Sequence, residues 1–149
     1  MVITTIKVNK KDVYNEVAKT TSYTGAKMAD EFAYERIFTT DEDQDMLNRF
    51  WDESKTTITN SLKKVLNSEE ENSAGEYTLQ LELSSAFDST LQDSMQRSLF
   101  SFFVMNITSK WYTFVNKSEA TGYATEAATY IEDIKRKAYY KKKPTRPTY

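Results

Sequence analysis

Hydrophobic and polar residues alternate at two places in the chain with the two-residue period of a β-strand. The first place is residues 2–8, where β-branched residues dominate and Val2, Ile6 and Val8 share one face. The second is residues 77–83, where Tyr or Leu occupies every other position and Thr, Gln and Glu lie between them. We expect these segments to form a small two-stranded β-sheet.

Three longer segments show the 3.6-residue period of a helix. The first begins at Thr40 and Asp43, which resemble a capping box, and its apolar stripe continues to Leu66, so it predicts a helix of about seven turns. The second covers residues 91–114, and the third covers residues 120–138. Toward the end of the second segment apolar residues occur all round the helix, so we expect several neighbours to bury it.

Shorter helical faces occur at residues 13–18 and 29–37, whereas the polar run "NSEEENSAGE" at 67–76 predicts a loop. Gly (3) and Pro (2) are scarce, which favours long helices with few connections over an all-β fold. The sequence therefore predicts a mainly α fold, a bundle of three long and two short helices with a small two-stranded β-sheet. We expect a single domain at 1–138, followed by an extended arm at 139–149.

The composition excludes several kinds of chemistry. The chain has no Cys and no His, which removes disulfides, thiol nucleophiles, imidazole bases and most structural zinc sites. No Gly-rich phosphate loop and no serine in a nucleophile elbow occur. We therefore expect no enzyme activity and no cofactor. The start of the chain does not resemble a signal peptide, and the longest apolar run, 99–107, is far shorter than the ~20 residues that span a bilayer.

Two acidic stretches need an explanation. The window "DEDQDMLNRFWD" imitates the spacing of a calcium loop, but Met46 stands where such a loop needs Gly for its sharp turn. Acidic residues are favoured at a helix N-terminus by the helix dipole, so we interpret this window as a helix start. Glu69, Glu70 and Glu71 are consecutive, so we expect them to point in different directions as a solvated charge run. Neither stretch predicts a metal site.

Aromatic residues are numerous for a core of this size. Two pairs of neighbours, Phe50 with Trp51 and Trp111 with Tyr112, lie on predicted helices. We expect one ring of each pair to lie at the rim. Surplus rings of this kind serve as anchors in protein interfaces, where Tyr, Trp and Arg concentrate.

Charge is distributed unevenly between the body and the end of the chain. Every charged residue from Lys135 onward is basic, so the residues before it carry a strong excess of acid. The last twelve residues, "AYYKKKPTRPTY", contain both prolines, which predicts a semi-rigid extended segment. We expect this arm to contact a neighbouring subunit through Tyr139, Tyr140, Lys141, Lys142, Lys143, Pro144, Arg146, Pro147 and Tyr149.

An alternative function for the arm is nucleic-acid binding. Its bases could neutralise phosphates, and its tyrosines could stack on nucleobases. The acidic pI of about 5.3 argues against this alternative, because nucleic-acid-binding domains are usually basic.

Four segments carry a resemblance to a known group of proteins: "FTTDEDQDMLNRFWDES", "YTLQLELSSAFDSTLQDSMQ", "SFFVMNITSKWYTFVNKSEA" and "YATEAATYIEDIKRKAYYKKKPTRP". Over roughly residues 40–149 the chain resembles small virion proteins of crAss-like tailed phages that infect Bacteroides. Within that group it looks most like the head–tail connector proteins of the neck.

This resemblance implies a structural virion protein in a homo-oligomeric ring of twelve copies between portal and tail. Its partners would be copies of itself, the portal and other neck or tail proteins, with a passing contact to packaged DNA left open. It implies synthesis in the bacterial cytoplasm, a final location in the virion neck, no membrane partner and no catalytic residues.

Overall fold

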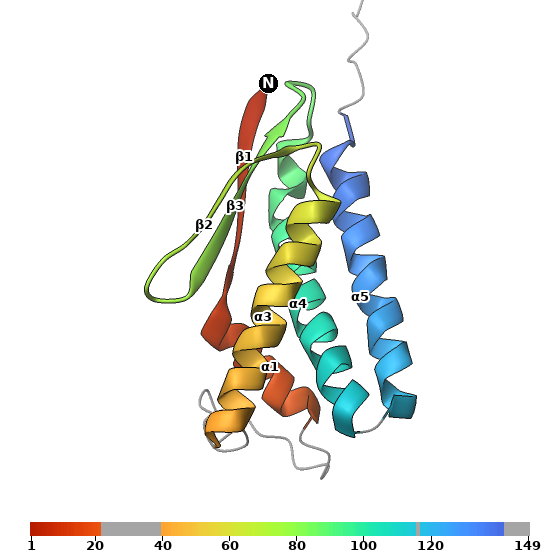
Figure 1. Cartoon of the computed structure of the whole chain (residues 1–149). Coiled ribbons are helices and arrows are strands. Elements are labelled where there is room, and N and C mark those ends of the chain that lie inside the picture. Colours follow the sequence, from red (N-terminus) through yellow and green to blue (C-terminus); the bar gives the residue numbers. More distant parts are fainter. Residues whose placement is uncertain (22–39, 116, 142–149) are drawn as a thin grey trace, which may run out of the picture.

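The computed structural model describes residues 1–21, 40–115 and 117–141, and within them it contains four α-helices, one short 3₁₀ helix and a three-stranded sheet (Figure 1). The elements follow in the order β1 (Val2–Asn9), α1 (Lys10–Thr21), α3 (Asp41–Ser61), β2 (Leu66–Glu71), β3 (Glu76–Leu83), η1 (Ser89–Leu91), α4 (Gln92–Val115) and α5 (Lys117–Ala138). The predicted mainly helical class is confirmed. The short helix predicted at 13–18 is α1, whereas the one predicted at 29–37 lies outside the described residues.

Helix α4 lies at the centre of the fold. It contacts α1, α3, α5 and β1, and α5 packs along its length (Figure 1). Phe102, Phe103, Val104 and Tyr112 are all buried although they point to different sides of the helix. A helix that is apolar all round requires neighbours on all sides, so the expectation for this segment is confirmed. None of the described helices has a stretch long and apolar enough to cross a bilayer.

The sheet is antiparallel with the strand order β1-β3-β2, so β3 is the central strand. Its inner face carries the apolar residues of β1 and β3, with Ile6 opposite Leu79 and Val8 opposite Tyr77. This face packs on the helices, where the ring of Tyr77 meets Trp51 edge-on at a centroid distance of 6.2 Å. The alternating pattern of the sequence therefore places both predicted strands correctly.

The predicted two-stranded sheet is wrong, because residues expected to form a polar loop supply a third strand, β2. In this strand Glu69 lies opposite Leu79 and Glu71 lies opposite Tyr77, so both carboxylates are on the inner face. They find polar partners there, since Glu69 accepts a hydrogen bond from the Tyr77 hydroxyl and Glu71 accepts one from Trp51. An edge strand tolerates such charges, and charged side chains discourage pairing with another chain.

Helix α3 begins as predicted and ends earlier. Thr40 is its N-cap, and its Oγ1 accepts a hydrogen bond from the backbone N–H of Asp43 at 3.0 Å. The helix ends at Ser61 rather than at Leu66, which begins β2. The predicted length is wrong because Val65, part of the same apolar stripe, is buried in the turn that follows the helix rather than in the helix itself.

The expectation for neighbouring rings is wrong for one pair. Phe50 and Trp51 are both buried, with exposed fractions of 3% and 0%. Trp51 can lie inside because its indole N–H reaches the Glu71 carboxylate of β2. In the second pair Tyr112 is buried, while Trp111 is partly exposed as expected.

Candidate assembly surface at the base of the arm

The predicted contact residues divide into two groups. Tyr139, Tyr140 and Lys141 are described by the structure and follow directly after α5. The remaining ones lie outside the described residues: Lys142, Lys143, Pro144, Arg146, Pro147 and Tyr149. The structure therefore describes the position of the first three predicted contact residues, which form the base of the arm.

The backbone fixes this base against the rest of the subunit. The N–H groups of Tyr139 and Tyr140 donate to the carbonyls of Lys135 and Lys137 at 3.3 and 3.1 Å, which ends α5 in a tight turn. Lys141 then forms an antiparallel bridge with Phe87, which is buried. The arm therefore leaves the body at a defined place.

Large apolar side chains are exposed at this place. Tyr139 and Tyr140 are 56% and 51% exposed, and Met1, Val2 and Ile3 at the start of β1 are exposed as well. Among the described residues, these five are all the large hydrophobic residues that are exposed. The start of β1 and the end of α5 lie at the same end of the molecule (Figure 1). We call these five residues the arm-base surface.

A groove of about 270 Å³ runs across the arm-base surface. Its lining includes Met1 before β1, Val65 before β2, Leu83 at the end of β3, and Tyr139 and Tyr140 after α5. Segments far apart in the sequence thus form one partly apolar depression at the point where the arm departs.

The basic residues just before the arm are paired within the subunit. Lys135 lies 3.6 Å from Glu132, Arg136 lies 2.8 Å from Asp133, and Lys137 lies 2.7 Å from the second oxygen of Asp133. In the sequence these cations form one basic cluster with those of the arm. In the structure each of them forms an ion pair with an acidic residue of the same helix. These three cations therefore already have acidic partners within their own subunit.

Asp133 also attaches α5 to α4. Its carboxylate accepts a hydrogen bond from the Ser98 hydroxyl at 2.6 Å. Burial by itself would raise the pKa of Asp133, but the hydrogen bonds from Lys137 and Ser98 and the charge of Lys137 together lower it. The helix that carries the arm is therefore held in place by an ionised carboxylate close to its C-terminal end.

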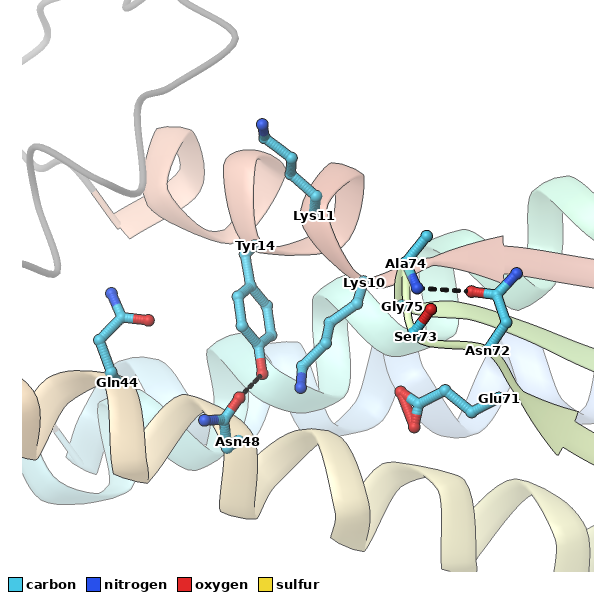
Figure 2. Close-up of a pocket in the computed structure, with 10 residues that line it drawn as sticks. All are labelled: Lys10, Lys11, Tyr14, Gln44, Asn48, Glu71, Asn72, Ser73, Ala74 and Gly75. Atoms are coloured by element: carbon cyan, nitrogen blue, oxygen red, sulfur yellow. Dashed lines mark hydrogen bonds between the residues drawn. The ribbon is translucent and has the colours of Figure 1, made fainter.

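A second depression, of about 610 Å³, lies at the other end of the sheet, between α1, α3 and the turn that connects β2 with β3 (Figure 2). Tyr14 donates its hydroxyl to Asn48 Oδ1 at 2.8 Å, and Lys10 Nζ lies 5.6 Å from the centre of the Tyr14 ring. Asn72 accepts hydrogen bonds from the backbone N–H groups of Ala74 and Glu76, both at 3.0 Å. The side chains of Tyr14, Asn48 and Asn72 thus already make hydrogen bonds that stabilise the fold.

Glu71 faces this depression, but it is poorly suited to act as a base. Burial would raise its pKa, yet hydrogen bonds from Lys55 and Trp51 and the charges of Lys55 and Lys10 together lower it. A carboxylate stabilised in its charged form in this way has little tendency to take a proton. Within residues 1–21, 40–115 and 117–141, no three acidic side chains come close enough to hold a metal ion.

The acidic window at the start of α3 and the glutamates of β2 have structural roles. Asp41, Glu42 and Asp43 form the first turn of α3, which agrees with the interpretation as a helix start. Glu69, Glu70 and Glu71 are all exposed, as expected for a solvated run, but the expectation missed that Glu69 and Glu71 also accept hydrogen bonds from Tyr77 and Trp51. In a strand Glu69 and Glu71 share one face and Glu70 lies on the other. Because all three residues are Glu, the sequence shows no alternation between hydrophobic and polar positions that would reveal the strand.

Comparison with known proteins adds no relative. No protein-family model matches the sequence, and no curated protein or solved structure matches the chain.

Proposed function

We propose that the chain is a structural subunit that assembles with copies of itself through the arm-base surface and the C-terminal arm. The observation that carries this proposal is the position of the exposed apolar residues. Met1, Val2, Ile3, Tyr139 and Tyr140 gather at the end from which the arm departs. Contiguous exposed apolar surface is typical of interaction sites, and aromatic residues such as Tyr are common anchors in them.

The charge pattern supports contact between subunits. The body has an excess of acidic residues, while Lys141, Lys142, Lys143 and Arg146 make the arm basic. Opposite charges on the arm of one subunit and the body of another would guide association and fix its register. The two prolines reduce the freedom that the arm loses on docking, so fewer contacts are needed to hold it.

The location that we propose for this assembly is the neck of a tailed-phage virion. There the chain would form a ring of twelve copies that acts as a head–tail connector between the portal and the tail proteins, with packaged DNA passing through. This part of the proposal rests on the resemblance to virion proteins of crAss-like phages. The mainly helical body agrees with it, as does the basic sequence with two prolines that follows α5.

Pairing of the cations in the last turn of α5 supports assembly over nucleic-acid binding. Lys135, Arg136 and Lys137 each have an acidic partner on the same helix, which leaves fewer free cations for phosphates. A nucleic-acid-binding protein would show an affinity that falls steeply with added salt, with a log–log slope near −0.9 for each phosphate neutralised. Contacts made by packed tyrosines depend less on salt.

Light scattering coupled to size-exclusion chromatography tests the proposal. The full chain should form a defined oligomer, and a chain lacking 142–149 should be monomeric with an unchanged far-ultraviolet circular dichroism spectrum. A matched control replaces Arg97 and Lys117 by Ala, because these exposed cations lie on α4 and α5, outside both the arm and the lining of the groove. A full chain that remains monomeric at high concentration would contradict the proposal.

The location in the neck has a separate test. If a labelled antibody against the chain bound purified particles away from the neck, the proposed location would be wrong.

A further inference from the structure

Strand β2 forms one edge of the sheet, and its backbone is open to a further strand. The N–H of Asn72 donates to the carbonyl of Glu76 at 3.1 Å, so Asn72 and Glu70 direct their backbone groups toward β3. Alternate residues of an antiparallel strand direct theirs the opposite way, so the N–H and C=O groups of Glu69 and Glu71 lie on the outer edge. Among the described residues these four groups have no hydrogen-bond partner.

A groove of about 440 Å³ lies between this edge strand and α3. Its lining includes Asp52 and Lys55 of α3, Glu69 and Glu71 of β2, and Tyr77 of β3. The side chains of Glu69 and Glu71 share the face of the sheet that is directed toward α3, because residues two apart in a strand point to the same side. We call this depression the acidic groove.

The acidic groove has an excess of negative charge. Lys55 is the one cation in its described lining, and it lies 2.8 Å from Glu71 and 3.2 Å from Asp52. Glu69 accepts a hydrogen bond from the Tyr77 hydroxyl and has no ion pair among the described residues. Burial and the hydrogen bond to Glu69 raise the pKa of the Tyr77 hydroxyl, and the charges of Glu69 and Glu71 raise it further, as a negative potential does. The groove is therefore suited to a cationic ligand.

We propose that the acidic groove and the open edge of β2 bind the basic arm of a second copy. This inference rests on the proposed function, because it specifies where the arm binds. An extended segment can add a strand to an exposed sheet edge, where main-chain hydrogen bonds supply affinity and alternate side chains supply specificity. Carboxylates along β2 keep two such edges apart, but they attract a segment that carries Lys142, Lys143 and Arg146 and no acid.

The prolines of the arm suit this edge and direct a cation toward the groove. A proline in an added strand is tolerated where its nitrogen faces away from the partner strand. The two residues that flank it then face β2, which matches the two open residues of the edge, and their side chains share the face of the groove carboxylates. With Pro144 facing away, Lys143 takes this position. With Pro147 facing away, Arg146 takes it, so each alignment directs a basic side chain toward the groove.

The direction of the chain favours a second copy over the arm's own subunit. Helix α5 runs toward the arm-base surface, whereas β2 runs from that end toward the turn between β2 and β3 (Figure 1). To reach its own groove, the arm would have to reverse its direction after Lys141. Lys143 and Arg146 each precede a proline, which favours extended backbone over such a reversal. From Lys141 to Arg146 the arm extends at most about 17 Å, so the second copy must place its groove within that distance.

Exchange of charge between groove and arm tests this docking site. A groove variant carries Asp52→Lys and Glu69→Lys, and an arm variant carries Lys143→Glu and Arg146→Glu. Each variant alone has like charges on its groove and its arm, so the concentration at which it assembles should rise about tenfold or more. An equimolar mixture should assemble again, because each groove then meets an arm of opposite charge. Size-exclusion chromatography with light scattering measures both variants and the mixture.

Two further variants serve as controls. Glu119→Lys with Glu126→Lys changes the same number of charges at exposed positions of α5, and it should assemble as the natural chain does. Asp52→Asn with Glu69→Gln removes the charges and keeps an acceptor for the Tyr77 hydroxyl. It should weaken assembly in the same direction, so it replaces the groove variant if circular dichroism shows that the latter does not fold.

Each other result overturns the docking site. Recovery in a chain that carries all four changes, without recovery in the mixture, means that the arm binds the groove of its own subunit. An equal loss of assembly in the α5 control means that total charge alone is responsible. Groove variants that assemble like the natural chain, while removal of 142–149 still gives a monomer, mean that the arm docks elsewhere and leave the proposed function intact. A monomeric full chain overturns the proposed function and the docking site together.

Discussion

Trp51 and Glu71 form a hydrogen bond that attaches the central part of α3 to the edge strand β2. The indole Nε1–H of Trp51 donates to Oε1 of Glu71 at 2.8 Å, and Lys55 Nζ lies 2.8 Å from the other carboxylate oxygen. Trp51 is completely buried and packs against Phe103 at a centroid distance of 4.7 Å. One carboxylate thus satisfies the polar group of a core residue and closes the sheet against the helix.

Replacement of Glu71 by Ala should lower the free energy of unfolding by about 1–2 kcal/mol. The substitution leaves the buried N–H of Trp51 without an acceptor, and Lys55 keeps only its weaker partner Asp52 at 3.2 Å. Because the Glu71 side chain is a quarter exposed, water moderates the loss. Urea denaturation followed by Trp fluorescence measures the change.

Glu70 provides the matched control for this prediction. It lies next to Glu71 on the same strand and is exposed, and its side chain makes no hydrogen bond or ion pair among the described residues. Glu70→Ala should change the free energy of unfolding by less than about 0.5 kcal/mol. Equal effects at the two positions would mean that the inward orientation of Glu71 contributes nothing to stability.

The sequence predicted the elements whose hydrophobic period is clear. The alternation at 77–83 and the capping pair Thr40 and Asp43 depend on neighbours in the chain, so local pattern suffices to find them. Strand β2 was missed because its inner face is polar. Its partners, Trp51 and Tyr77, come from other elements, and no local pattern reveals them.

The candidate surface was predicted only in part. The arm and its tyrosines are visible in the sequence because composition changes abruptly at residue 139. The contribution of Met1, Val2 and Ile3 was not predictable, since it depends on β1 pairing with β3 so that its start lies beside the end of α5.

Acid should destabilise the protein through carboxylates whose pKa values are lowered in the fold. The pKa values of Glu71 and Asp133 lie below their ordinary values of 4.5 and 3.8, because hydrogen bonds and charges from Lys55 and Lys137 outweigh the effect of burial. The unfolded chain therefore binds more protons in this range. Stability is complete above the ordinary values and falls as pH decreases toward the lowered ones.

Urea midpoints measured from about pH 6 to about pH 3 test this sign. The double variant Glu71→Gln and Asp133→Asn should be less stable at pH 6 and should show a shallower decline toward pH 3. Glu70→Gln is the control and should keep the slope of the natural chain. A double variant with an unchanged slope would show that other carboxylates control acid unfolding.

Two glycines should respond to Ala in opposite directions. Gly75 has φ of 80° in the turn between β2 and β3, and a Cβ there would lie 3.0 Å from Cβ of Lys10. Gly75→Ala should therefore destabilise the protein by about 1 kcal/mol or more. Gly122 lies within α5 with nothing within 4 Å of a new Cβ, so Gly122→Ala should stabilise it by about 0.5–1 kcal/mol. Thermal unfolding followed by circular dichroism compares the two, and a shift in the same direction would contradict the backbone argument.

Thr108 carries a hydroxyl that the fold buries without a partner. Its side chain is completely buried in α4, and among the described residues Oγ1 is the one buried side-chain polar atom with no hydrogen bond. Removing such a hydroxyl while keeping the shape of the side chain relieves a desolvation penalty, so Thr108→Val should raise the free energy of unfolding by about 1 kcal/mol.

Thr113 is the matched control on the same helix. Its hydroxyl donates to the carbonyl of Ser109 at 2.9 Å, and the residue is exposed, so Thr113→Val removes a satisfied group that water can also reach. Its effect should stay within about 0.5 kcal/mol of zero. Both variants are measured by urea denaturation at neutral pH with equal m-values as a condition for comparison. If Thr108→Val destabilised the protein by 1 kcal/mol or more, the hydroxyl would have a partner in solution, and α4 would be packed differently around residue 108.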